Sequence, residues 1–470
     1  MELNANAFGR NSRKSLADKG LQEALGRTTG RFSLHRAAAV AAFPGFEAAR
    51  ERASRVKQDV LDRLGAYLER FIAEAEKRGA TVHVARDAAQ AREIAARIAR
   101  DEGVTLAVKS KSMAAEEVSF NEALEAAGVT VVESDLGEFI IQLAGEPPSH
   151  IIAPAVHKTR EEVSRLFERH LGEARTDSIP ALVAMARKHL RAKFLSAGMG
   201  VSGANFLVAD TGSIVLVTNE GNGRMGTILP RVHLAVAGIE KVIPRMADLP
   251  DFLRVLPRSA SGQAISSYVS IVTGTKRPGD PEGPERMHIL LLDCGRSAIL
   301  EGKYREVLKC IRCGACLNAC PVYQSVGGHA YGWVYSGPIG AVLTPLLAGL
   351  PEAAALPDAS TLCGACAEVC PVKIPLPDFL LELRSDARDQ GLKTPGEIAG
   401  MKGYAAVMKR AGLLEALERV AGALGRLFAK GKGIAGLPYP LSGWTERRDF
   451  PSPAPLPFRK QWKIRRGAGG

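Results

Sequence analysis

Seven of the eight cysteines in this 470-residue sequence fall in two short motifs between positions 310 and 370. The first motif has the spacing C-x2-C-x2-C-x3-C-P, and the second has the spacing C-x2-C-x3-C-P. The first contains Cys310, Cys313, Cys316 and Cys320, and the second contains Cys363, Cys366 and Cys370. Thiolates at these intervals are typical of ferredoxins that hold two iron–sulfur clusters. The motifs therefore predict two adjacent [4Fe-4S] clusters that carry electrons.

The order of the cysteines predicts which thiolates share a cluster. In two-cluster ferredoxins the last cysteine of each motif binds the cluster of the other motif. This rule gives the first cluster Cys310, Cys313, Cys316 and Cys370, and gives the second cluster Cys320, Cys363 and Cys366. Ser360 stands where the first motif has Cys310. The second cluster then has a fourth ligand from the Ser360 hydroxyl, from water or from a partner, or it lacks one iron and is [3Fe-4S].

Two alternatives apply to the cysteines. Paired C-x2-C motifs also form structural zinc sites with four thiolates. The C-x3-C-P endings and the count of seven favour iron–sulfur clusters over zinc. Cys294 lies alone after the apolar run HILLLD, and we expect a small buried side chain there. Supplying the missing ligand is the alternative role for this thiol.

The residues before the motifs predict an α/β domain. Segments 80–85, 105–110 and 129–134 read as strands, and helical stretches separate them. Such alternation is typical of βαβ units on a parallel sheet. Further apolar runs up to Asp293 extend the pattern, so we expect one domain over 55–300 with a mixed sheet of at least six strands. Apolar residues at helical spacing over 54–78 predict one amphipathic helix at its start.

The remaining segments have no strand pattern. We expect a helical or extended segment over 1–54 and a helical ferredoxin domain over 301–395. Residues 396–470 are expected to form a helix and then an extended tail rich in proline and aromatic residues. The aromatic side chains of this tail, which we expect to pack on the body or on a partner, are Trp444, Phe450, Phe458 and Trp462.

Composition narrows the class of protein. No run approaches the roughly 18 apolar residues of a spanning helix, and the first residues lack a secretory signal. We therefore expect a cytoplasmic protein that is not integral to a membrane, with peripheral binding at the inner membrane face as an alternative. The net charge of +12 is spread along the sequence and is interpreted as favouring solubility rather than nucleic-acid binding. An acidic partner remains an alternative.

Several polar groups in the α/β region are candidates for substrate binding. The glycines of G-x-G-x-x-G at positions 198–203 follow a helical stretch rather than a strand, which argues against a dinucleotide site. Residues 219–224 follow the strand-like run IVLVT, and ligands of α/β sheets collect at such strand ends. There Arg224 could bind a carboxylate and Glu220 could act as a base, although a plain loop is the simpler interpretation. His150 and His157 are weaker acid–base candidates.

Four segments together resemble the lactate utilization protein B family. They are GVSGANFLVADTGSIVLVTNEGN, CIRCGACLNACPVY, TLCGACAEVCPVKIPLPDFL and PLSGWTERRDFP. The resemblance covers nearly the whole chain and includes the three-cysteine second motif. It implies a lactate-utilization domain with a fold similar to ribose-5-phosphate isomerase and CoA transferases, followed by a dicluster ferredoxin-type domain. The seven cysteines are the only site residues that it transfers, and the catalytic residues stay unknown.

The resemblance also implies a function. It suggests an iron–sulfur electron-transfer subunit that works with lactate utilization proteins A and C while L-lactate becomes pyruvate. An electron acceptor, associated with the membrane or not, would be a further partner. The alternatives are a subunit that serves another 2-hydroxy acid or glycerol-3-phosphate, and an α/β domain that is itself the dehydrogenase. In the last case Glu220 or His150 would be the base, and Arg224 would hold the lactate carboxylate.

Overall fold

The computed structural model describes residues 3–428, 433–438, 441–445, 448–452, 454 and 456–467. The chain divides into two compact units, Met1–Ala387 and Arg388–Gly470. The first unit contains both the α/β region and all the cysteine motifs. The domain boundaries expected after residues 54, 300 and 395 stay predictions.

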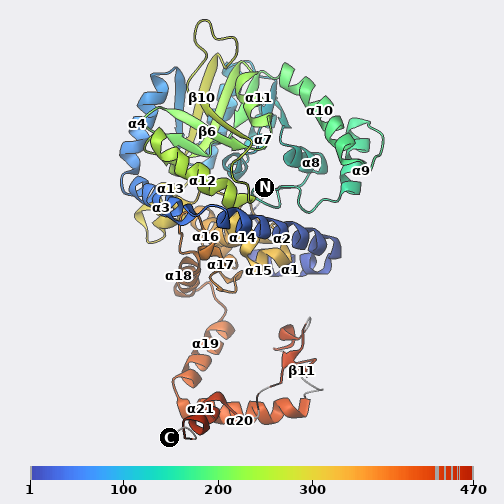
Figure 1. Ribbon diagram of the computed structural model, residues 1–470, viewed down its shortest axis with the longest axis vertical. Helices are drawn as coiled ribbons and strands as arrows, with labels where there is room; N and C mark the ends of the chain where they lie inside the picture. Colours follow the sequence, from blue (N-terminus) through green and yellow to red (C-terminus); the bar gives the residue numbers. More distant parts are fainter. Residues whose placement is uncertain are drawn as a thin grey trace. The chain divides into compact units, whose positions relative to one another are not determined.

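A six-stranded sheet with parallel pairing throughout forms the centre of the first unit (Figure 1). Its strands, in spatial order, are β1 (Ala80–Ala85), β10 (Arg286–Leu292), β7 (Val232–Gly238), β4 (Met199–Ser202), β2 (Leu106–Lys109) and β3 (Thr130–Glu133). Five of these strands coincide with apolar runs in the sequence, so the α/β fold class is confirmed. Because all the strands are parallel, their carboxyl ends meet at one edge of the sheet.

Four more strands of the first unit form a separate sheet. In spatial order they are β8 (Val242–Ile243), β5 (Phe206–Val208), β6 (Ser213–Thr218) and β9 (Tyr268–Val272). Here β5 pairs with β8 in parallel, whereas β6 pairs with β5 and β9 in antiparallel fashion. The mixed pairing expected of the α/β domain is therefore confined to the smaller sheet.

Helices cover both faces of the parallel sheet. They are α4 (Leu64–Glu76), α5 (Ala88–Asp101), α6 (Met113–Glu117), α7 (Phe120–Ala126), α8 (Leu136–Ala144), α10 (Ile179–Ser196) and α11 (Asn222–Ile228). Three further helices, α9 (Arg160–Leu171), α12 (Leu249–Ala260) and α13 (Arg296–Glu301), pack mainly on other helical segments. Along β10, Leu290 and Leu292 pack into the cluster under α5 and α7, while Ile289 and Leu291 pack into the cluster under α4. Alternate residues of one strand thus fill two cores, which explains why these strands read as unbroken apolar runs.

The glycine-rich segment 198–203 is a strand and not a phosphate-binding loop. Gly200 lies in the centre of β4, and a Cβ atom there would stand 1.7 Å from the carbonyl oxygen of Gly226 in α11. The glycine is therefore required for the close packing of α11 on the sheet. The sequence did not predict β4, because this strand is short and has no apolar run.

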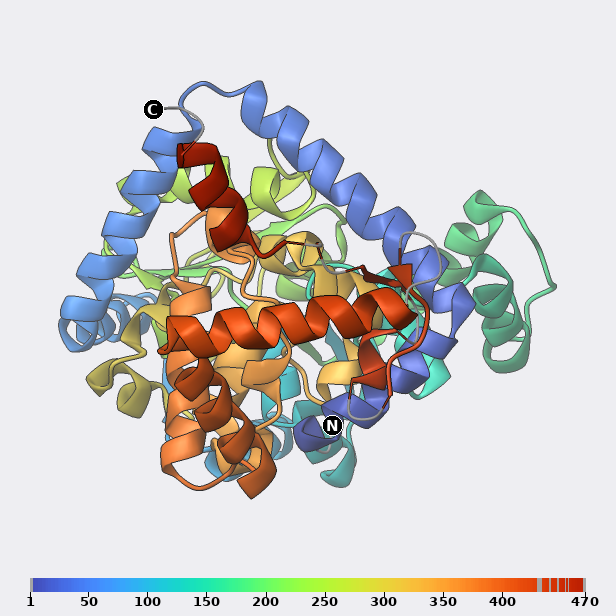
Figure 2. The same ribbon diagram turned by 90° about the horizontal axis from the view of Figure 1, so that it is seen from below.

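Three helices precede α4 in the N-terminal region, and the helix expected over 54–78 is divided between the last of them and α4. They are α1 (Phe8–Ala17), α2 (Lys19–Ala41) and α3 (Phe46–Asp62). The expected helix was wrong in detail, since α3 ends at Asp62 and α4 begins at Leu64 after a non-helical Arg63 (φ −136°, ψ 32°). Figure 2 shows α2 and α3 as two straight blue helices that meet at a sharp turn.

The cysteine motifs lie in a helical domain that packs on α2 and α3. Its helices are α14 (Ala315–Ala319), α15 (Pro321–Val326), α16 (Gly337–Ala348), α17 (Ala365–Glu368) and α18 (Leu376–Asp389). No strand is assigned between Arg296 and Asp389, all of which the structure describes, so the expectation of a helical ferredoxin domain is confirmed. Short 3-10 segments such as η4 (Arg305–Lys309) join the helices.

The second unit contains α19 (Pro395–Met408), α20 (Ala411–Phe428), the short strands β11 (Gly433–Ile434) and β12 (Phe450–Pro451), and α21 (Phe458–Gly467). The expected helix is present. The tail is less extended than expected, because β11 pairs with β12 and residues 458–467 form α21. Its aromatic rings pack in pairs, Trp444 with Phe450 and Phe458 with Trp462. Parts of the expected tail, including 439–440, 446–447 and 468–470, lie outside the described residues.

No helix among the described residues is long and apolar enough to cross a membrane.

The buried His233 predicts a pH dependence of stability. It lies in β7, its Nε2 is 2.9 Å from Ser202 Oγ, and burial lowers its pKa from 6.5 to about 4. Between pH 6.5 and 4 the unfolded chain therefore binds more protons at this site than the folded chain, so stability is lost as the pH falls. The loss is about 1.4 kcal/mol for each pH unit. In thermal unfolding at pH 7 and pH 5, we expect His233→Gln to show a smaller difference than the unmodified protein, and an unchanged difference would contradict this.

Candidate functional site

The two cysteine motifs have the same backbone conformation. The sequence Cys-Gly-Ala-Cys occurs in both, at 313–316 and at 363–366. The residue before each first cysteine has a positive φ, 58° at Arg312 and 54° at Leu362, and so has the following glycine, 78° at Gly314 and 85° at Gly364. A short helix then begins in each copy, α14 and α17. The repeat therefore presents the thiols of both motifs in the same way.

Four thiols from both motifs line one small cavity. They are Cys310, Cys313, Cys316 and Cys370, the set expected for the first cluster. Most of the other lining residues are apolar, among them Ile311, Ile339, Val372 and Leu376. Burial, and then the neighbouring thiols Cys313, Cys310 and Cys370, raise the pKa of Cys316. Protons held this tightly must leave when a metal binds, which couples the filling of this site to pH.

Backbone N–H groups point at sulfurs of this first thiol group. The N–H of Arg312 donates to Cys310 Sγ at 3.4 Å, and the N–H of Ile374 donates to Cys370 Sγ at 3.4 Å. Such donors stabilise thiolate charge and raise the potential of a bound cluster. The donor set, the apolar walls and the N–H groups all fit an iron–sulfur cluster.

The remaining three thiols form a second group nearer the surface. Burial, and then Cys320, raise the pKa of Cys366 to about 12, and Cys363 is a neighbour of both. Cys363 is exposed, and the backbone N–H of Ala365 lowers its pKa. The three are the set expected for the second cluster. In the described part of the chain, no three His, Cys, Asp or Glu side chains are close enough together to bind one single metal ion, whereas a cluster several ångströms wide needs ligands that stand further apart.

Ser360 occupies the place of a fourth ligand in the second motif. Its Oγ accepts a hydrogen bond of 3.1 Å from the N–H of Leu362, just as Cys310 Sγ accepts from Arg312. The serine is therefore the structural equivalent of Cys310. Cys294, in contrast, packs against the core of the α/β domain, where burial and then Glu117 raise its pKa to about 12.

The N-terminal helices hold the second motif in place. Arg50 in α3 donates to the carbonyl oxygens of Cys370 at 2.7 Å and of Ala367 at 3.1 Å. Ser54 in the same helix donates to the carbonyl oxygen of Val372 at 3.1 Å. The sequence pattern gave no sign of these contacts, because they join segments more than 300 residues apart.

A cavity of about 430 Å³ lies at the carboxyl edge of the parallel sheet and reaches Cys313. Segments that follow β2, β3, β4, β6, β7 and β10 contribute to its wall, together with Arg312 and Tyr335 from the ferredoxin domain. Its charged lining residues are Lys111, Asp135, Glu220, Glu240, Lys241, Arg296 and Arg312. The α/β domain thus presents a polar cavity directly beside the first thiol group.

A buried ion network forms one side of this cavity. Arg296 donates to both carboxylate oxygens of Glu117 at 2.8 Å and, through Nε, to Glu240 at 2.7 Å. Arg312 pairs with the other oxygen of Glu240 at 3.3 Å, and its guanidinium lies 4.8 Å from the ring centre of Tyr335. Although burial opposes it, the two arginines hold the pKa of Glu240 at about 2. The network therefore connects the sheet edge to the first cysteine motif.

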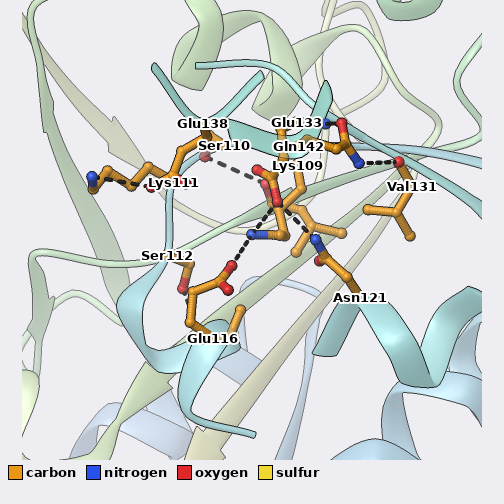
Figure 3. Close-up of polar contacts among 12 residues, drawn as sticks. Lys109, Ser110, Lys111, Ser112, Glu116, Asn121, Val131, Glu133, Glu138 and Gln142 are labelled. Carbon is orange, nitrogen blue, oxygen red and sulfur yellow. Dashed lines mark hydrogen bonds and ion pairs between the residues drawn. The ribbon is translucent and has the colours of Figure 1, made fainter. Parts of the chain in front are cut away.

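A second buried network fixes the segment after β2. Lys109 is fully buried, and its Nζ lies 2.8 Å from Glu116 and 2.7 Å from Glu133 (Figure 3). Asn121 donates to Glu133 at 2.8 Å. Lys109 directly precedes three residues that line the large cavity, Ser110–Ser112. The network therefore holds one wall of the cavity in a defined position.

Two protein families match the chain in consecutive regions. Residues 68–292 match the LUD domain, and residues 306–374 match the 4Fe-4S dicluster domain. Lactate utilization protein B of Shouchella clausii is 41% identical over 463 residues, which cover 98% of this chain and 98% of the relative. The chain belongs to the lactate utilization protein B family. The proteins of this name from Bacillus velezensis (41% identity, 99% of this chain and 98% of the relative) and Bacillus licheniformis (40%, 100% and 99%) are similar over comparable lengths.

A DUF162 family protein from Deinococcus radiodurans with a known crystal structure overlaps 49% of this chain and 98% of its own. The sequence identity is 14%, and the TM-score is 0.27. The assignment of residues 68–292 to the LUD domain therefore rests on the sequence match. The resemblance to the lactate utilization protein B family is confirmed, and so is the dicluster domain.

The polar candidates in the LUD domain of this family member occupy different surroundings. Glu220 lines the large cavity, where burial and then Asp135 raise its pKa. Arg224 is exposed on α11 and is not part of the cavity wall. His150 is buried, its Nδ1 accepts from the N–H of Ile152 at 3.0 Å, and its Nε2 lies 3.1 Å from Asn318 Oδ1. Both ring nitrogens are thus occupied, and the contact of Nε2 with Asn318 joins the α/β region to the first cysteine motif.

His157 also has a structural environment, with Nε2 2.7 Å from a Glu146 carboxylate oxygen and its ring against His329. The sequence pattern missed Lys241, Arg296 and Arg312, which the structure brings together at the cavity. Only Arg312 had a signal in the sequence, because it lies inside the first cysteine motif and must therefore be close to the thiols.

Proposed function

We propose that this protein is the iron–sulfur electron-transfer subunit of a system that oxidises L-lactate to pyruvate. The observation that carries the proposal is the cavity lined by four thiols from two separate motifs. The names of the relatives supply the connection with lactate. Two clusters held by the seven cysteines would accept and release electrons one at a time.

The arrangement of the thiols supports transfer between two sites. Cys316 belongs to the first thiol group, and Cys366 of the second group is among the thiols that raise its pKa, after burial and the members of its own group. The two groups are therefore neighbours. Cys363 of the second group is exposed, so this group is accessible to a partner protein. We infer that electrons enter near the large cavity and leave through the second group, toward lactate utilization proteins A and C or an electron acceptor.

The content of iron and sulfide tests the proposal directly. Two [4Fe-4S] clusters would bring about eight iron and eight sulfide ions for each chain, and a [3Fe-4S] second cluster would bring about seven iron ions. We expect one of these values in protein purified without oxygen, with EPR signals that distinguish the two cluster types. A colourless preparation, or zinc in place of iron, would contradict the proposal.

A further inference from the structure

The cavity at the sheet edge has an excess of positive charge beside the first thiol group. Arg296 and Arg312 are balanced by the two carboxylates that they contact, Glu117 and Glu240. Lys241 also lines the cavity, but its ammonium group has no ion pair or hydrogen bond with any residue that the structure describes. Burial, and then Arg312, lower the pKa of Lys241 to about 8. Lys241 is half-buried, and the neighbouring carboxylate of Glu240 is already paired with both arginines, so this end of the cavity favours a bound anion.

Arg312 offers a second donor at the same end. Its side chain is only 8% exposed, and its Nη1 has no hydrogen-bond partner among the described residues. Its Nη2 is paired with the carboxylate of Glu240, and this contact leaves Nη1 free to donate to a ligand. A planar anion with two oxygens is the partner that a guanidinium group and a neighbouring ammonium group bind best.

The wall of the cavity also contains polar groups that are not cationic. Asp135 and Glu220 form a second charged group there, and Asn205, Ser110 and Ser112 are further lining residues. Such groups suit hydroxyl or carbonyl groups on the body of a small acid. The volume of about 430 Å³ lies within the range of small-molecule sites and would hold acids larger than lactate.

We propose that this cavity binds a small organic acid, with Lys241 and Arg312 holding its carboxylate beside Cys313. The proposal rests on the proposed function, because a carboxylic acid next to the first cluster has a role only if a cluster is present. It deepens that function by giving the LUD domain of this chain a ligand of its own.

Calorimetric titration of the cluster-loaded, full-length protein without oxygen tests the proposal. The probes are L-lactate, pyruvate and malate, with chloride and inorganic phosphate as anions that lack a carboxylate. We expect saturable binding of at least one of the three acids. We also expect Lys241→Gln to weaken that binding at least tenfold and Lys241→Arg to weaken it less.

Lys276→Gln is the matched control, because it removes the same charge from the LUD domain at an exposed site paired with Glu285, away from the cavity. It should bind the acid as the unmodified protein does. Absence of saturable binding, equal weakening by Lys276→Gln, or equal affinity for phosphate or chloride would overturn the proposal. Iron is counted in each sample first, so normal iron content without acid binding refutes this inference alone, whereas absent iron refutes the proposed function.

Discussion

Replacing Cys370 with alanine is expected to remove the same cluster as Cys313→Ala, although the two cysteines belong to different motifs. Both thiols line the first thiol cavity, and burial followed by Cys370 raises the pKa of Cys313. A [4Fe-4S] cluster depends on its thiolate ligands, so each variant should lose about half of its iron, or about four ions for each chain. The measurement is iron content together with the EPR spectrum of the reduced protein.

The matched pair for the second cluster is Cys320→Ala and Cys366→Ala. These two variants should share one EPR spectrum, different from the spectrum shared by Cys370→Ala and Cys313→Ala. Cys294→Ala is the control, and it should keep all its iron, because Cys294 is partly buried against the core of the α/β domain. If Cys370→Ala instead resembled Cys366→Ala, each motif would serve its own cluster and the crossed assignment would be wrong.

The cysteine spacing predicts two thiol groups from local sequence, because the ligands of a cluster must follow a fixed local path of the backbone, and the assignment of each thiol to a cluster stays a prediction. The repeated Cys-Gly-Ala-Cys sequence, with positive φ values at equivalent positions, is that path. The strands β1, β2, β3, β7 and β10 were predictable for a similar reason. Each is a short run rich in apolar residues, and that pattern is local.

The features that the sequence did not reveal depend on contacts between distant segments. Strand β4 contains glycine because α11 packs closely on it, and this requirement is visible only in three dimensions. The division of the strands between two sheets depends on pairing, which apolar runs do not specify. Lys241, Arg296 and Arg312 are ordinary basic residues in the sequence, and only the fold places them around Glu240. The contacts of Arg50 with the second motif have the same origin.

Arg296 is the buried residue whose loss should be most costly to the fold. Its side chain is 1% exposed, and those of Glu117 and Glu240 are 4% and 1% exposed. Arg296→Met would keep much of the side-chain volume but leave Glu117 without its bidentate partner and Glu240 with Arg312 alone. Removal of one member of a buried ion network costs about 3–5 kcal/mol, because a charge remains buried without compensation. We expect a decrease of that size in the free energy of unfolding, measured by urea denaturation without oxygen.

Two further variants separate charge from packing. Arg286→Met removes an arginine whose side chain is 67% exposed and 3.7 Å from Glu102, so it should change stability by less than about 1 kcal/mol. Adding Glu117→Gln to Arg296→Met neutralises the carboxylate that lost its partner, and it should restore part of the lost stability. If Arg296→Met cost no more than Arg286→Met, the network would contribute little to the fold, and its role would lie in the charge that it places beside the cavity.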